Sequence, residues 1–476
     1  MNDLRILIAR LGWPSTSARW WTMQELAARL GKPETKAETE SSLLHLLRLR
    51  KLEAEVVEVL CIFWIAVKEL NYSPPNFLAE NIISPSPLSV LLMNAIGSSI
   101  YLSNNDLTLV SEDFIIPDDF DIVQGADLPR IFHTTISRLE AFSHRPFVRQ
   151  MAFEWTKNRM AYPEAPYQGD AGYFIRPLGD GFAPHFSTRT ALRAISAYLR
   201  TLAVARHFWE IPAELINQQS LLALPIHPTL AFLRPKRPEW LPTFTELNGD
   251  SKEIEASLLT LLAQVEVENS GDELIAFSSP ISMSMEQCIE VSIVRWLQIG
   301  NGDMGETELG SHLESFWREG LMLSSQAQEP LSSTTLVVPH WVNKDCKAWP
   351  LAGTLDLGRI GYLQHDLYPS RLFLPTMVGS ENVIEITPYK DELQAKIKEQ
   401  VIAKFHYWNA GWGPAQPRQL KGNCGTALIS RGTAYREGAE VNKTQRTFYS
   451  WQVRILHRNG SYEQFDEKIT RGVIFV

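Results

Sequence analysis

The sequence predicts an α+β protein with a mostly helical N-terminal two-thirds and a mixed α/β C-terminal domain that ends in antiparallel strands. Two contrasting patterns support this fold class. Apolar residues recur at helical spacing before residue 330, whereas short β-branched and aromatic runs bounded by Pro, Gly and Asn dominate after residue 331. In addition, Asn459-Gly460 lies between two such runs and is the strongest hairpin signal in the chain.

The chain has 476 residues, and at roughly 100–200 residues per domain this length indicates about three domains. Changes of composition along the chain suggest four segments. We expect an N-terminal helical domain (1–120), a basic helical segment (121–235), an acidic helical segment (236–330) and a C-terminal mixed α/β domain (331–476).

The first segment is predicted to form helices. A short amphipathic helix begins at Thr22 and ends near Gly31, because glycine is common just past a helix C-terminus. A long helix follows from Ser41 or Ser42 to residue 70, and its many leucines predict extensive burial. The apolar run 56–67 contains Glu58 and is shorter than the roughly 20 residues of a membrane span, so we expect no membrane segment there.

The second segment is also predicted to be helical. Two helices cover 129–145 and 146–162, with Pro146 in the first turn of the second, where its fixed φ suits a helix. A third helix follows Ser187 or Thr188, either of which can cap it, and extends to residue 209. Basic side chains spaced by four and seven residues lie along one face of that helix.

In the third segment, apolar spacing predicts helices over 257–268, 285–300 and 308–323. The fourth segment changes character. Strands are expected over 334–341, 359–365, 370–375 and 382–387, an amphipathic helix over 388–408, and an antiparallel β element over 426–437, 447–465 and 471–476.

Charge is distributed unevenly along the chain, whose net charge is −9. Residues 130–209 hold eleven Lys and Arg against five Asp and Glu, whereas 246–329 hold three against sixteen. Such segregation predicts two surfaces with different partners, nucleic acid or another polyanion for the basic segment and a partner protein for the acidic one. The alternative is that the two segments face each other and partly neutralise.

Cysteine usage and the N-terminus predict a cytoplasmic protein. The four cysteines are far apart and form no CxxC pair, which argues against a disulfide framework, a redox pair and a zinc ribbon. The N-terminal apolar run lacks the core and cleavage site of a signal peptide. No nucleotide-binding glycine motif or metal-ligand spacing occurs, so we expect no cofactor and no metal.

The candidate site centres on the stretch 169–193, which contains two Gly-Asp turns and leads into the arginine-faced helix. Backbone N–H groups of such turns, a helix N-terminus and arginine side chains all favour phosphate. The simpler interpretation is a pair of tight turns that feed a capped helix. The residues predicted to contact phosphate are Arg145, Arg149, Arg159, Arg176, His185, Arg189, Arg193 and Arg200.

Two weaker candidates for catalysis lie in the C-terminal domain. Asp356, Glu381 and Glu385, with nearby histidines, supply the carboxylates that a metal-dependent hydrolase or nuclease would need. Cys424 lies in a loop with some likeness to the nucleophile loops of cysteine peptidases, but its surroundings favour a strand over the long helix that such a nucleophile opens.

These observations favour a non-catalytic cytosolic subunit of a multi-protein assembly that contacts nucleic acid or another polyanion through a basic helical face. The acidic segment 246–329 would bind a partner protein. Two alternatives stay open: a metal-dependent hydrolase or nuclease with its site in the C-terminal domain, and a pure protein–protein scaffold.

Overall fold

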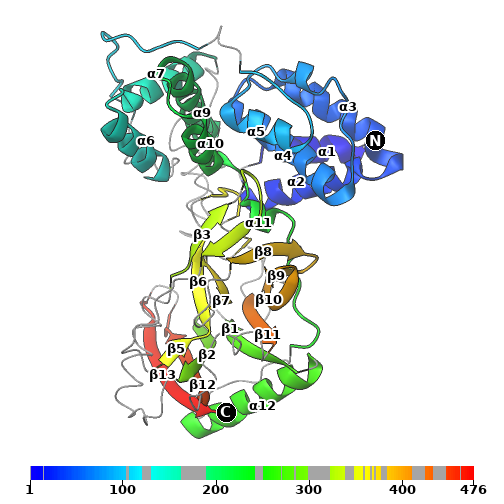
Figure 1. Ribbon diagram of the computed structural model, residues 1–476, viewed down its shortest axis with the longest axis vertical. Coiled ribbons are helices and arrows are strands. Elements are labelled where there is room, and N and C mark those ends of the chain that lie inside the picture. Colours follow the sequence, from blue (N-terminus) through cyan, green and yellow to red (C-terminus); the bar gives the residue numbers. More distant parts are fainter. Residues whose placement is uncertain are drawn as a thin grey trace. The chain divides into compact units, whose positions relative to one another are not determined.

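The computed structural model of the chain divides into two units (Figure 1). Unit 1 comprises Met1–Ala231, Glu329–Leu331 and Gly358–Leu367, and unit 2 comprises Phe232–Gln328, Ser332–Leu357 and Tyr368–Val476. The N-terminal part is helical and the C-terminal part holds a large antiparallel sheet, so the protein is α+β. The structure describes all residues except 1, 14, 103–106, 119, 121–129, 162–188, 242–249, 270, 284–285, 299–321, 328, 338–347, 358–359, 365–366, 369–370, 377–382, 410–423, 432–445 and 461–462.

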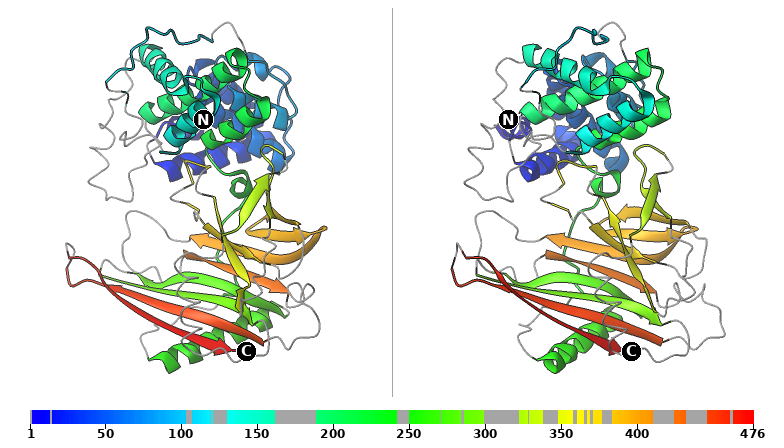
Figure 2. Two further views of the ribbon diagram at one scale, coloured as in Figure 1. Left: turned by 60° about the vertical axis from the view of Figure 1, so that its left-hand side comes forward. Right: turned by 90° about the vertical axis from the view of Figure 1, so that its left-hand side faces the viewer.

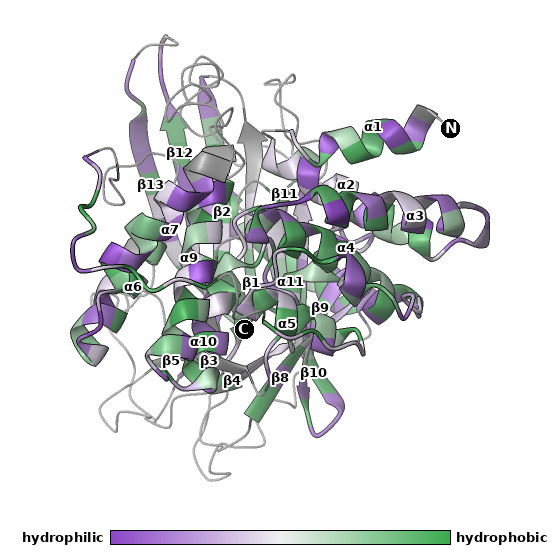
Figure 3. Cartoon of the chain, turned by 90° about the horizontal axis from the view of Figure 1, so that it is seen from above, coloured by the Kyte–Doolittle hydropathy of each residue, from purple (hydrophilic) through white to green (hydrophobic). Residues whose placement is uncertain are grey.

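Unit 1 is an assembly of helices around the buried helix α4, in which every residue from 53 to 66 is buried. Helices α2, α5 and α9 pack against α4, and α7 packs against α9. Figure 3 shows hydrophilic and hydrophobic residues alternating along α3 and α6, as in helices with one side towards solvent. The bounds are α1 (Asn2–Arg10), α2 (Thr16–Leu30), α3 (Pro33–Leu49), α4 (Glu53–Leu70), η1 (Ala79–Asn81), α5 (Pro87–Ala95), α6 (Arg130–Ser143), α7 (Phe147–Ala161), α9 (Arg189–Phe208), α10 (Ala213–Ser220), η4 (Leu221–Ala223) and α11 (Pro228–Ala231).

The long helix predicted from Ser41 or Ser42 to residue 70 is wrong, because the structure has two helices there. Helix α3 begins earlier, with Pro33 in its first turn, and α4 begins at Glu53. Arg50 and Leu52 between them are extended, with ψ values of 123° and 131°. Leu52 is buried, so the break inserts an apolar side chain into the core. The expected end of α2 at Gly31 is confirmed.

Unit 2 is built on one large antiparallel sheet with the strand order β13-β12-β2-β1-β11-β10-β9-β8-β4-β3 (Figure 2). Strand β5 adds to β2, and β6 and β7 form a separate pair. The bounds are β1 (Asp272–Met283), β2 (Gln287–Gln298), β3 (Ser324–Ala327), β4 (Thr334–Val337), β5 (Ala348–Pro350), β6 (Ala352–Asp356), β7 (Arg371–Pro375), β8 (Val383–Tyr389), β9 (Glu392–Ile397), β10 (Gln400–Asn409), β11 (Cys424–Arg431), β12 (Arg446–His457) and β13 (Asp466–Phe475).

Helix α12 (Ser251–Glu268) covers one face of this sheet (Figure 2). The Asp250 carboxylate caps the helix by accepting the N–H groups of Lys252 and Glu253 at 3.0 and 3.1 Å. Residues of α12 at helical spacing then pack on alternate residues of β2 and on two tryptophans of the sheet. The members of this core are Ile254, Leu258, Leu261, Val265, Ile289, Val291, Ile293, Trp408 and Trp451.

Both tryptophans of this core lie opposite a glycine on the neighbouring strand. Trp408 pairs with Gly425, and Trp451 pairs with Gly472. A Cβ on Gly425 would come within 2.6 Å of the Trp408 ring, and a Cβ on Gly472 within 2.4 Å of the Trp451 ring. Each indole therefore occupies the space that a side chain would fill, which pins the register of its strand pair.

The helix predicted over 388–408 is wrong, because this segment forms two hairpins between β8, β9 and β10. Each hairpin turns through two residues, Lys390–Asp391 and Lys398–Glu399. Lys390, Lys398 and Glu399 adopt φ values of 56°, 47° and 66°. Such left-handed turns normally contain Asn or Gly, so the sequence carried no turn signal and the charged residues resembled a helix surface.

Other expectations for the C-terminal region have mixed outcomes. The helix predicted over 285–300 is wrong: the segment forms strand β2, whose buried residues Ile289, Val291 and Ile293 alternate with period two. The strand expected over 359–365 forms turns in its described part. An antiparallel hairpin around Asn459-Gly460 is confirmed by the pairing of β12 with β13. The connection is longer than a two-residue turn, because pairing starts at His457 and Asp466 and neither Asn459 nor Gly460 has positive φ. The helix expected over 308–323 lies almost wholly outside the described residues.

Candidate functional site

The eight predicted phosphate contacts have different positions in unit 1. Arg176 and His185 lie outside the described residues, as does most of the 169–193 stretch. Arg159 belongs to α7 and Arg189 begins α9, but their side chains are outside the described part of the chain. The remaining four residues, Arg145, Arg149, Arg193 and Arg200, can be placed in full.

Arg200 lies in a buried ionic network that joins three helices. Its Nε donates to Glu154 of α7 at 2.7 Å, and its Nη1 donates to Glu53 of α4 at 3.0 Å. The side-chain amide of Gln150 also belongs to the network, because it donates to the other carboxylate oxygen of Glu154 at 3.0 Å. Burial opposes the charge of Arg200, but attraction to the two carboxylates outweighs it and raises the arginine's pKa. This guanidinium therefore stabilises the helix assembly.

Glu53 shows what this burial does to a carboxylate. Its side chain is 1% exposed, and burial raises its pKa to about 7, although Arg200 acts in the opposite direction. The second carboxylate, Glu154, is also fully buried and acts against the ionisation of Glu53. The network therefore contains two carboxylates and one guanidinium, and the Glu53 carboxylate changes its protonation state near neutral pH.

Arg193 is likewise internal, with 4% of its surface exposed. Its guanidinium carbon lies 5.4 Å from the ring centre of Trp155, and its backbone oxygen accepts the amide of Asn158 at 3.3 Å. The helical face that carries Arg193 and Arg200 is thus turned towards α7. The spacing argument correctly placed the two residues on one side of α9, but that side faces protein.

Several exposed cations of unit 1 lie at one end of α6, α7 and α9. The ring of Phe147, in the first turn of α7, lies 4.8 Å from the ring of Trp209, which directly follows α9. Three residues join α6 to α7, so the end of α6 lies at the same place. We call this surface the basic end; its residues, all exposed except the half-buried Arg149, are Arg138, Phe142, His144, Arg145, Arg149, Arg206, His207 and Phe208.

The local bonds of the basic end hold its backbone and leave its cations at the surface. A carboxylate oxygen of Glu140 accepts the backbone N–H of Val148 at 2.8 Å, which caps α7. Arg149 donates to the backbone oxygen of Glu112 at 3.1 Å, so its charge is not neutralised by a carboxylate in that contact. Sequence reasoning found Arg145 and Arg149 but missed Arg138, four residues before Phe142 and thus on the same helix face.

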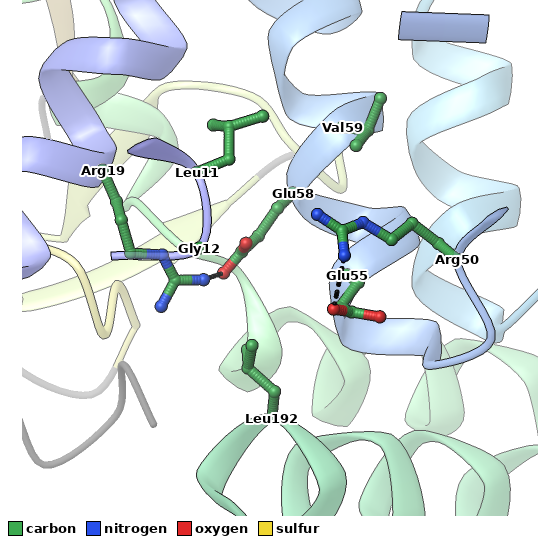
Figure 4. A pocket seen from close by; sticks show the side chains of 8 residues that line it. All are labelled: Leu11, Gly12, Arg19, Arg50, Glu55, Glu58, Val59 and Leu192. Carbon is green, nitrogen blue, oxygen red and sulfur yellow. Dashed lines mark hydrogen bonds and ion pairs between the residues drawn. The ribbon is translucent and has the colours of Figure 1, made fainter. Parts of the chain in front are cut away.

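Figure 4 shows a second polar feature of unit 1, a cavity of about 70 Å³ between α2, α4 and α9. Arg19 of α2 points at Glu58 of α4, and Arg50, just after α3, points at Glu55. The hydroxyl of Tyr362 also donates to Glu58, at 2.6 Å. The remaining residues that line the cavity are Leu11, Gly12, Val59 and Leu192.

The cavity lies at a polar junction with room for water. Each guanidinium is paired with a carboxylate of the same wall, so the cavity has no net formal charge to attract an ion. A water molecule needs roughly 10–15 Å³ of such space, so the volume accommodates a few waters. Burial and the Glu58 carboxylate raise the pKa of the Tyr362 phenol, which remains a hydrogen-bond donor.

Of the carboxylates proposed for metal chemistry, the two that the structure describes lie on different sheets or strands. Asp356 ends β6 in the separate two-stranded sheet, Glu385 lies on β8, and Glu381 is outside the described residues. Within the described part of the chain, no three His, Cys, Asp or Glu side chains form a metal-binding group. His406 is buried beside Glu392, and burial lowers its pKa to about 4.

Cys424 is the first residue of β11. Burial, together with the nearby Glu290, raises the pKa of its thiol. A nucleophilic cysteine requires the opposite shift, because the thiolate is the reactive form. The surroundings of Cys424 therefore favour a structural thiol.

Comparisons with models of known protein families, with curated proteins and with solved structures find no match to this chain. Function must therefore be argued from the chemistry of its surfaces. No helix among the described residues is long and apolar enough to cross a membrane.

Proposed function

We propose that this protein is a non-catalytic subunit of a larger assembly and that it contacts nucleic acid or another polyanion through the basic end. The observation that supports the proposal is the convergence of Arg138, Arg145, Arg149 and Arg206 at the adjoining ends of α6, α7 and α9. Guanidinium groups bind phosphate in bidentate geometry and are always charged at neutral pH.

Two features of the fold support the function of this surface. The helix ends are rigid, because the Phe147–Trp209 contact and the Glu140 cap hold them together. The buried Arg193 and the half-buried Arg200 do not belong to this surface; they contact Trp155 and Glu154 of α7, where they stabilise the packing of α7 on α9. A rigid scaffold presents surface arginines with a small loss of conformational entropy on binding.

The proposal is tested by fluorescence anisotropy with the full chain and labelled single- and double-stranded oligonucleotides over a salt series. Binding should weaken with salt, with a slope of about −0.7 to −0.9 per phosphate neutralised. The variant Arg145→Ala/Arg149→Ala/Arg206→Ala should bind several-fold more weakly and with a slope smaller by about 2–3.

The matched control removes cations elsewhere in unit 1. Arg5, Lys32 and Lys68 are exposed, on α1, just before α3 and on α4, so Arg5→Ala/Lys32→Ala/Lys68→Ala lowers the net charge by the same three units without changing the basic end. This control should bind like the unmodified chain. Absent binding, salt-independent binding, or equal losses in the two variants would each overturn the proposal. Magnesium-dependent cleavage would instead favour the hydrolase alternative.

The protein partner of the acidic segment is part of the same proposal. The outer side of α12 exposes Glu266 and Glu268 beside Leu259 and Val267, a combination that suits a basic, partly apolar surface on another protein. A partner bound there should dissociate with salt and fail to bind Glu266→Lys/Glu268→Lys. A partner retained by that variant would exclude this surface.

A further inference from the structure

We propose that the polyanion bound at the basic end is single-stranded nucleic acid, whose bases stack on Phe142 and Phe208 while the arginines hold its phosphates. This inference rests on the proposed function and names its ligand class. It depends on an observation that charge alone does not explain, namely two exposed aromatic rings among the cations.

The exposure of these rings is large. Phe142 is 80% exposed in the last turns of α6, and Phe208 is 42% exposed at the end of α9. Phe142 gains almost none of the stability that burial of its ring would contribute to the fold, whereas Phe208 is partly buried, with its ring edge-on to that of His207 at 4.6 Å. Both rings instead present a hydrophobic face to solvent, which is the property that a base-stacking platform requires.

The positions of the arginines relative to Phe142 suit a nucleotide strand. Arg138 lies four residues earlier in α6, one helical turn away on the same face and about 6 Å along the axis. Arg145 lies three residues beyond, in the turn that leads to α7. A base stacked on the ring would therefore have a cation on either side for its flanking phosphates.

The acidic residues around the basic end favour one path for the strand. Glu210 and Glu214 are exposed at the start of the connection to α10 and of α10 itself, and they would repel phosphates there. Glu140 is used as the cap of α7. Glu112, whose backbone oxygen accepts from Arg149, is exposed, as is the neighbouring Asp113. The favourable path therefore passes Phe208 and Arg206, crosses the α6–α7 turn at Arg145 and continues along Arg138, away from α10 and from residues 112–113.

Exposed rings discriminate between single strands and duplexes. In a duplex the bases are stacked on one another and have no free face for Phe142 or Phe208, whereas a single strand offers a face at every nucleotide. Arginine side chains can contact the phosphates of a duplex and of a single strand alike. Single-stranded ligands should therefore bind more tightly than a hairpin duplex of the same composition at equal salt.

The experiment compares Phe142→Ala/Phe208→Ala with Tyr101→Ala, which removes an aromatic ring that is 88% exposed elsewhere in unit 1. Anisotropy is measured on single-stranded DNA, single-stranded RNA and a hairpin duplex. The double variant should weaken binding to single strands by about 5-fold or more, with an unchanged salt slope, because stacking is lost and phosphate contacts remain. Duplex binding and the Tyr101→Ala control should be unaffected.

The outcomes separate this inference from the proposed function. Loss of binding in the arginine variant with none in the phenylalanine variant, or equal binding of duplex and single strand, would overturn the single-strand assignment and leave polyanion contact intact. Absence of any binding by the unmodified chain would overturn both. Thermal melting of Phe142→Ala/Phe208→Ala verifies folding, which is expected to be retained because both side chains are exposed.

Discussion

Replacement of Arg200 by methionine provides the most direct test of the buried network in unit 1. Methionine retains an unbranched apolar stem and removes the charge. The change would leave Glu53 and Glu154, whose side chains are 1% and 0% exposed, buried beside each other without their shared cation. Removal of one partner from a buried ion pair costs about 3–5 kcal/mol, because the remaining charge stays desolvated.

That loss would lower the melting temperature of the unit by roughly 6–20 °C, at about 2–4 °C per kcal/mol for a unit of this size. The measurement is thermal and urea unfolding of the full chain at pH 8, followed by circular dichroism. The matched control is Arg5→Met on α1, an exposed position where a change of less than about 0.5 kcal/mol is expected. Arg200→Met/Glu53→Gln should recover much of the stability, because one carboxylate is then neutral.

The loss of stability in Arg200→Met should be smaller at pH 5 than at pH 8. At pH 5 Glu53 is largely protonated in the folded state, because burial raises its pKa to about 7, and the arginine then has less charge to compensate. The reasoning would be refuted by a shift of less than about 2 °C at pH 8, or by equal losses at pH 5 and pH 8. Folded Arg200→Met should still bind the polyanion, since Arg200 lies in the network and not at the basic end.

Two further predictions concern Glu53 and the tryptophan–glycine pairs. The folded state binds more protons than the unfolded state between the ordinary pKa of Glu53, 4.5, and its raised value of about 7. Urea unfolding should therefore show stability falling as pH rises through this range, by on the order of 1–3 kcal/mol more than in Glu53→Gln; parallel pH profiles would contradict this. Gly472→Ala should cost about 1–3 kcal/mol in the same assay, because its Cβ meets the Trp451 ring at 2.4 Å, whereas Gly460→Ala, with no contact closer than 3.9 Å, should be tolerated. Equal melting of these two variants would argue against the pinned register.

The elements that the sequence predicted well are those with a local physical signal. Gly31 ends α2 at a helix cap, and Pro146 immediately precedes α7, where its fixed φ suits a helix start. Alternating residues on both sides of Asn459-Gly460 lead to the β12–β13 hairpin. Each of these signals is local, so it can be recognised without knowledge of the fold. Only Pro146 acts through the expected backbone conformation, because Gly31 has φ −78° and neither Asn459 nor Gly460 has positive φ.

The failures arose where distant contacts override local preference. The two hairpins over 388–408 turn at Lys and Glu residues with positive φ. The backbone strain of these turns is offset by the hydrogen bonds and packing of the paired strands. The apolar side chains of strand β2 fit both the helical and the strand period over a short window, so the local pattern predicts a helix there as readily as a strand. Pairing with strands that are distant in the sequence, such as β12, selects the strand over the helix, and a local sequence pattern carries no information about such partners.

For the candidate site, the sequence by itself determined the concentration of cations in residues 130–209 and the spacing of Arg193 and Arg200 on one side of α9. Tertiary structure alone decided which cations reach solvent. Helix α9 packs against both α4 and α7, so Glu53 and Glu154 reach Arg200 and pair with its guanidinium, although they lie 147 and 46 residues away. Arg145 lies in the turn between α6 and α7 and is exposed, and Arg149 is half-buried with its guanidinium on the backbone oxygen of Glu112, so no buried carboxylate of the helix packing takes up these two cations in the contacts described.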